Sequence, residues 1–157
     1  MAERTSYRDF ACSTAQALEI VGEWWTLLIV RDAFFGVRRF DDFQRRLGMS
    51  RSVLTIRLNR LVDEGVLETR EYESRPPRVE YVLTRKGADL FPVLVSLQQW
   101  GDRWASPKPP VVLRHRACGR QTRPHLVCSA CGERVSAADV SAEPGPGGSD
   151  PNMLPPD

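Results

Sequence analysis

The feature that most constrains the fold is a pair of short amphipathic segments joined by a very short turn. Apolar residues recur every three or four positions in each segment, as one face of a helix requires: Phe40, Phe43 and Leu47 in the first, and Leu54, Leu58, Leu61 and Val62 in the second. Gly48 is placed to end the first helix, and Ser50 to cap the second, which Gly65 ends. The chain is therefore predicted to contain two helices that meet at a tight corner.

Two further helices are predicted before this pair. Ser13 or Thr14 can cap a helix that runs to about Val21, and a second helix extends from about Glu23 to Phe35, where Gly36 ends it. Its segment 24–30 is apolar almost all round, so we expect that helix to be buried on most sides.

Strands and a last helix are predicted after the pair. Segments 66–72 and 78–83 have the character of strands, and residues 73–77 form a hairpin tip stiffened by proline. Thr84 is predicted to cap a long helix that runs to about Trp104, with a bend at Pro92. The apolar residues of this helix form a main stripe with three others beside it: Val93, Leu97, Trp100 and Trp104, and then Phe91, Leu94 and Val95.

Two helices at a tight turn, with arginines on the second and a hairpin directly after it, are typical of the winged helix-turn-helix fold that binds DNA. The predicted fold class is therefore mainly α with a small β-hairpin wing, and the predicted partner is double-stranded DNA. Candidate DNA contacts on the second helix are Ser50, Arg51, Ser52, Thr55, Ile56, Arg57, Asn59 and Arg60, and those on the hairpin are Arg75 and Arg78.

The side chains of these candidates suit different parts of DNA. Asn59 and Arg60 have donors for base edges, and Ile56 suits a thymine methyl group. Arg51 and Arg57 are placed for phosphates. In the alternative interpretation, the arginines form a solvated helix face with acidic partners: Asp63, Glu64 and Glu68.

The distribution of charge supports a DNA partner more than its total does. The chain has a net charge of +2, yet residues 38–86 carry +4, residues 114–135 also carry +4, and residues 136–157 carry −4. A winged-helix adaptor that binds protein would not need arginines converging on the second helix and the hairpin. An enzyme is not expected, because both histidines lie in a cysteine cluster and no phosphate-binding glycine loop is present.

Motifs over residues 11–104 resemble the HxlR-type winged-helix transcriptional regulators, which are related to the MarR group. The resemblance rests on Cys12–Leu18, Gly22–Ile29, Arg39–Phe40, Ser50–Leu58, Gly65–Leu67, Pro77–Tyr81 and Leu83–Gly87. It implies a homodimer on a near-palindromic operator, with a recognition helix in each major groove and a wing beside it. Our own hypothesis is a repressor rather than an activator. The sequence departs from the family at Ser13, where a proline commonly follows the cysteine.

Dimerisation is also predicted from the residues. The helix predicted from about Glu23 to Phe35 and the last helix have more apolar surface than a domain of this length can bury. The domain order is predicted as a flexible N-terminus (1–10), the winged-helix domain (11–106), a proline-rich linker (107–113), a cysteine module (114–135) and a disordered acidic tail (136–157).

The cysteine module contains two copies of one pattern. His115-Arg-Ala-Cys118-Gly and Cys128-Ser-Ala-Cys131-Gly each place two ligands three residues apart, followed by glycine. This is the spacing of a zinc ribbon, so we expect a small zinc-ribbon-like module with one structural zinc per subunit. His125 also lies three residues before Cys128 and is the competing nitrogen ligand. The alternative is that these cysteines are reduced and bind no metal.

Cys12 lies near a predicted helix N-terminus and is a candidate sensor of oxidants or electrophiles that acts through DNA binding. A small buried apolar residue is the alternative role for this thiol. The longest apolar run, residues 24–30, is too short to cross a bilayer, and the N-terminus lacks a signal-peptide core, so we expect a cytoplasmic protein with no membrane partner. The effector is expected to be a small molecule or an oxidant.

Overall fold

The computed structural model describes residues 6–7 and 11–147. Contacts divide the chain into two compact units, one ending at Leu94 and the other beginning at Val95. The predicted flexible residues 1–5 and 8–10, and the predicted acidic tail from residue 148, lie outside the described residues. No helix of the described part is long and apolar enough to cross a membrane.

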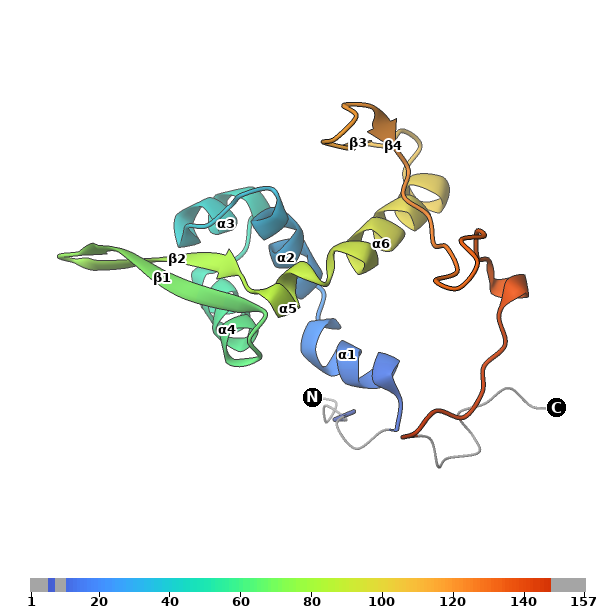
Figure 1. Ribbon diagram of the computed structural model, residues 1–157. Helices are drawn as coiled ribbons and strands as arrows, with labels where there is room; N and C mark the ends of the chain where they lie inside the picture. The colour runs from blue at the N-terminus through green and yellow to red at the C-terminus, as the bar shows by residue number, and fades with distance from the viewer. Residues whose placement is uncertain (1–5, 8–10, 148–157) are drawn as a thin grey trace. The chain divides into compact units, whose positions relative to one another are not determined.

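Four helices open the first unit: α1 (Ser13–Val21), α2 (Thr26–Phe34), α3 (Phe40–Leu47) and α4 (Arg51–Asp63) (Figure 1). The predicted tight corner between the last two is confirmed. Gly48 ends α3 at a φ of +66°, and the Ser50 hydroxyl caps α4 by accepting the Val53 N–H at 3.4 Å. Gly65 follows α4 at a φ of +67°. Glycine suits both positions because it adopts positive φ without a Cβ penalty.

The starts of α1 and α2 differ from the prediction. Cys12, not Ser13 or Thr14, is the N-cap of α1, because its carbonyl accepts the first helical bond, from the Gln16 N–H at 3.0 Å. The residues before Thr26 form a turn, so α2 begins later than about Glu23. Burial of the apolar run is also less complete than expected, since the Trp24 side chain is 89% exposed.

The core of this unit lies between α2, α3, α4 and the start of the hairpin. Its buried members are Ile29, Val30, Phe43, Met49, Leu54, Leu58, Leu61, Val66 and Leu67. Leu54, Leu58 and Leu61 are fully buried, as their helical spacing predicts. The inner face of α4 is therefore fixed by packing.

A buried carboxylate joins α2 to α3. Asp32 on α2 is fully buried, and it accepts hydrogen bonds from Arg31 at 2.8 Å and from Arg46 on α3 at 3.1 Å. Both guanidinium groups remain partly exposed. A buried charge needs such partners, so the α2–α3 arrangement depends on this pairing.

The predicted hairpin consists of β1 (Leu67–Ser74) and β2 (Pro77–Leu83), which pair in antiparallel register from Leu67↔Leu83 to Ser74↔Pro77, with an irregularity at Tyr72. Its tip is shorter than the predicted link, with a cis Arg75–Pro76 peptide between the strands. The hairpin extends past α3 and α4 (Figure 1). The Tyr81 N–H donates to the Arg38 carbonyl at 2.8 Å, which ties the hairpin to the segment before α3.

The predicted single last helix is wrong, because two helices stand in its place. Thr84 caps α5 (Arg85–Ala88) through its hydroxyl, which accepts the Gly87 N–H, and α6 (Phe91–Trp104) begins after Leu90. Pro92 therefore lies in the first turn of α6, where its missing N–H has no helical partner to lose. The expected bend is replaced by a break before the proline.

The buried and exposed residues of α6 also differ from those that the apolar stripe predicts. Leu94 packs against the core, and Val95 is 6% exposed. The main stripe, by contrast, lies largely in solvent: Val93, Leu97, Trp100 and Trp104 are 47–65% exposed.

The second unit contains the rest of α6, a two-stranded ribbon of β3 (Leu113–Arg114) and β4 (Gln121–Thr122), and the 3-10 helix η1 (Ala137–Asp139). Ser136 and Asp139 form a capping box around η1, and the predicted disorder of residues 136–157 stays a prediction. No described residue from 107 to 147 is buried. This segment therefore has no hydrophobic core of its own.

Gly87 of α5 is buried against the start of the hairpin, where an added Cβ would overlap the Val66 carbonyl and crowd Leu83. We predict that Gly87→Ala lowers the free energy of unfolding by about 1–3 kcal/mol, the usual cost of overpacking. Gly101→Ala is the matched control, because nothing lies within 4 Å of its added Cβ, and it should raise stability by up to about 1 kcal/mol. Equal denaturant midpoints for the two variants would contradict this packing.

Candidate nucleic-acid interface

The outer face of α4 is opposite its buried leucines and carries small polar side chains around one large apolar residue. Ser52, Thr55, Ile56 and Asn59 are all exposed, and the Ile56 side chain is 62% exposed. The Thr55 hydroxyl is already used within the helix, donating to the Arg51 carbonyl at 2.8 Å. Ser52, Ile56 and Asn59 are therefore the side chains of this face best placed for an external partner.

Ser50 and Arg51 lie at the N-terminal end of the same helix. The Arg51 guanidinium lies over the Phe40 ring at 4.7 Å and donates to Asp41 at 3.2 Å, and its side chain is 69% exposed. These contacts between exposed groups are weak, so Arg51 is held in position without being withdrawn from solvent. The helix N-terminus beside it also favours an anion.

Arg57 and Arg60 point to the flanks of α4 and are paired with carboxylates. Arg57, 22% exposed, donates to Glu23 at 2.9 Å. Arg60 forms ion pairs with Glu64 at 2.9 Å and with Glu19 of α1 at 3.8 Å. The sequence analysis named Glu64 as an acidic partner of these arginines. It did not name Glu19 on α1 or Glu23, which follows α1. A DNA contact by either arginine would have to replace a carboxylate, so their predicted roles at phosphates and bases remain predictions.

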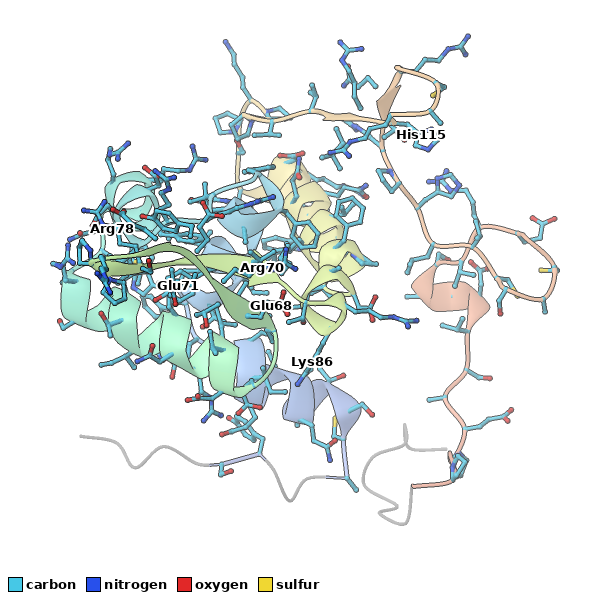
Figure 2. All side chains as sticks on the ribbon, turned by 60° about the vertical axis from the view of Figure 1, so that its left-hand side comes forward. Glu68, Arg70, Glu71, Arg78, Lys86 and His115 are labelled. Atoms are coloured by element: carbon cyan, nitrogen blue, oxygen red, sulfur yellow. The ribbon has the colours of Figure 1, made fainter. Side chains whose placement is uncertain are left out.

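The hairpin presents its arginines at the free end. Arg75 is exposed at the tip, and Arg78, 58% exposed, lies 3.4 Å from Glu73 across the strands. Figure 2 shows Arg78 near that end, while Glu68 and Arg70 lie closer to the base of the hairpin. Arg70 is paired with Glu68 at 2.6 Å, so among the described hairpin arginines Arg75 at the tip is the one without a carboxylate partner.

Two arginines that the sequence analysis did not propose lie beside this surface. Arg38 and Arg39 precede α3, are each 56% exposed, and both approach Glu80 of β2. Arg39 also lies over the Tyr72 ring at 4.6 Å. Their adjacency in sequence and the start of the basic segment at residue 38 are the signals that identify them.

The cysteine module contains two turns with the same backbone pattern. In the first, the Gly119 N–H donates to the His115 carbonyl at 2.8 Å, the His115 N–H donates to the Arg120 carbonyl at 2.9 Å, and Gly119 has a φ of +66°. The Cys118 Sγ lies 3.4 Å from the His115 Nδ1. Figure 2 marks His115 in this turn.

In the second turn, the Gly132 N–H donates to the Cys128 carbonyl and the Cys128 N–H donates to the Glu133 carbonyl, both at 2.8 Å, with a φ of +78° at Gly132. Backbone hydrogen bonds from Cys131 and Ala130, together with one from the Cys131 side chain, lower the pKa of the Cys128 thiol. Nowhere in residues 6–7 and 11–147 are three His, Cys, Asp or Glu side chains grouped so that they could hold a metal ion. Each turn thus presents two of the predicted ligands without completing a site.

The remaining cysteine, Cys12, is half-buried and is not in a disulfide. Its position as the N-cap of α1 agrees with the expectation that it lies near a helix N-terminus.

The HxlR-like helix-turn-helix family matches residues 20–109. The HTH-type transcriptional regulator Rv3095 of Mycobacterium tuberculosis is 50% identical over 145 residues, which are 90% of this chain and 91% of that relative.

Proteins of known structure also superpose on this chain. The crystal structure of PA1607, described as a transcription-factor candidate, superposes with a TM-score of 0.78 at 38% identity, covering 88% of this chain and 99% of that one. The redox regulator HypR in its reduced form superposes with a TM-score of 0.55 at 28% identity over 58% of this chain and 91% of that one. Its oxidised form gives 0.56 at the same identity, over 60% and 99%.

Proposed function

The chain belongs to the HxlR-like helix-turn-helix family and is a transcriptional regulator rather than an enzyme, and from this premise we propose that it is a dimeric, cytoplasmic repressor that binds a near-palindromic operator. In this proposal α4 lies in the major groove and the β1–β2 hairpin contacts the adjacent backbone or minor groove.

The observation that carries this proposal is the composition of the outer face of α4. Ile56 is 62% exposed on a face that is otherwise polar, and water gives such a side chain no compensation. A thymine methyl group supplies an apolar partner, and the Asn59 amide can pair with both the N6 and N7 atoms of adenine. Base edges therefore offer partners to both Ile56 and Asn59, whereas water offers no apolar partner to Ile56.

Exposed arginines at both ends of this face are suited to phosphates. Arg51 stands at the start of α4, and Arg75 and Arg78 stand at the hairpin tip. Phosphate contacts of this kind supply affinity and orientation without sequence information. Since Arg57 and Arg60 are already paired with carboxylates, we assign the sequence preference to Ser52, Ile56 and Asn59.

Binding to DNA upstream of the protein's own gene tests this division of roles. Asn59→Ala should weaken binding to that fragment by about five- to 150-fold, the worth of a good bidentate base contact, and leave binding to random DNA unchanged. Arg78→Ala should weaken both equally and reduce the salt dependence by about one phosphate contact, whereas Arg85→Ala, an exposed arginine outside the hairpin, should do neither. Wild-type protein that binds the fragment no tighter than random DNA would refute the proposal.

The proposed dimer rests on the exposed stripe of α6. Leu97, Trp100 and Trp104 are 52%, 61% and 65% exposed, and they recur on one helix face. A second copy is the partner we infer, because a near-palindromic operator requires two recognition helices related by a twofold axis, about 34 Å or a multiple of it apart.

Light scattering on the purified protein measures this association. Trp100→Glu should convert the dimer to a folded monomer, because a charge in an apolar interface has no partner. Ile56→Glu, which places the same charge on an exposed apolar position of α4, should remain dimeric and lose DNA binding. A wild-type monomer, or a dimer that survives Trp100→Glu with unchanged affinity, would contradict the interface.

Redox control through Cys12 is a second proposal, favoured by the structural similarity to the redox regulator HypR in both of its forms. Hydrogen peroxide would transfer one oxygen atom to the Cys12 sulfur, giving a sulfenic acid and one molecule of water, and the added hydroxyl would change the start of α1. We predict that peroxide alters the DNA affinity of the parent and of Cys118→Ser, and has no effect on Cys12→Ser. A Cys12→Ser variant that responds like the parent would exclude this role.

A further inference from the structure

The two turns of the cysteine module are structurally equivalent, although they lie thirteen residues apart in the sequence. In each turn, the residue after the second ligand is a glycine at positive φ that closes a bond to the carbonyl of the first ligand. The flanking backbone also repeats, since Arg114 pairs with Gln121 beside the first turn and Val127 pairs with Arg134 beside the second.

We propose that His115, Cys118, Cys128 and Cys131 bind one structural Zn²⁺ ion in each subunit, with His115 Nδ1 and three sulfur atoms as ligands. The proposal is independent of the function assigned to α4 and the hairpin.

The first turn already has the spacing that such an ion requires. Zinc bonds of about 2.3 Å to sulfur and about 2.0–2.1 Å to nitrogen, at a tetrahedral angle, place the two ligand atoms about 3.6 Å apart. The Cys118 Sγ and the His115 Nδ1 are 3.4 Å apart. It is therefore Nδ1, and not Nε2, that faces the sulfur and would complete the pair.

The second turn positions Cys128 and Cys131 with the same backbone bonds, since the Gly132 N–H donates to the Cys128 carbonyl and the Cys128 N–H donates to the Glu133 carbonyl, both at 2.8 Å. Three soft sulfur ligands with one imidazole favour Zn²⁺ over the oxygen-seeking Mg²⁺ and Ca²⁺. Four protein ligands leave no open position, so the ion is structural and not catalytic.

The metal also supplies what this segment lacks. No described residue from 107 to 147 is buried, so this segment has no apolar core to hold its two turns in place. Binding of one ion by both turns would bring the pairs together, and the free energy of binding would become free energy of folding.

Metal content and cobalt binding of the full chain test the site. Protein purified without chelator should contain one zinc per chain, and apo-protein titrated with Co²⁺ should give a 1:1 tetrahedral complex with a thiolate-to-cobalt absorption band. Cys118→Ser and Cys131→Ser should each weaken Co²⁺ binding by more than about 100-fold, because even loss of an outer-shell partner costs about 10- to 100-fold.

Controls within the chain separate this site from adventitious binding. Cys12→Ser and His125→Ala should bind Co²⁺ like the parent, whereas His115→Ala should not. Chelation should speed amide exchange at Gly119 and Gly132 and leave α4 unchanged. Metal-free wild-type protein that binds no Co²⁺, or binding that survives Cys118→Ser and Cys131→Ser, would overturn the site. Loss of binding in His125→Ala with retention in His115→Ala would overturn the assigned nitrogen ligand.

Discussion

The packing of three leucines on one side of α4 determines what the other side can do. Leu54, Leu58 and Leu61 are fully buried against α2, α3 and the first residues of the hairpin, and each contributes about 1.5–3 kcal/mol through burial. Rotation of the helix by one residue, about 100°, would move these side chains into water. Because that rotation is so costly, Ser52, Ile56 and Asn59 are held outward, and the helix presents one defined face to a partner.

Polar contacts place the neighbouring elements around this helix. Asp32 holds α3 to α2 through Arg46, the Ser50 hydroxyl starts α4 directly after the turn, and the carbonyl of Arg38 holds the hairpin through Tyr81. The carboxylates of Glu23 and Glu64 hold Arg57 and Arg60 at the flanks of α4. The arginines therefore form two groups. Arg57 and Arg60 are paired within the fold, whereas the arginines at the start of α4 and at the hairpin tip are exposed, where phosphates would lie.

Local signals allowed much of this unit to be predicted from the sequence. The glycines at 48 and 65, the cap at Ser50 and the leucine spacing depend on neighbouring residues, and the structure confirms all of them. The split of the last helix was missed because Pro92 fits a first turn as well as it bends a helix, and periodicity does not distinguish these outcomes. The pairing of Arg57 with Glu23 spans 34 residues, and the faces of α6 depend on packing, so neither has a local signal. The repeated spacing of the candidate ligands in the cysteine module is visible in the sequence, whereas the equivalent hydrogen bonds of its two turns needed the structure.

Selection of DNA from a random pool tests most directly whether the outer face of α4 reads sequence. The full-length protein should enrich an inverted repeat whose half-sites are centred about one DNA turn, or a multiple of it, apart. Asn59→Ala should enrich the same repeat with the preference lost at one base pair in each half-site, the position that its amide contacts. Enrichment of no sequence by the parent, or an identical preference at every position for Asn59→Ala, would contradict the account.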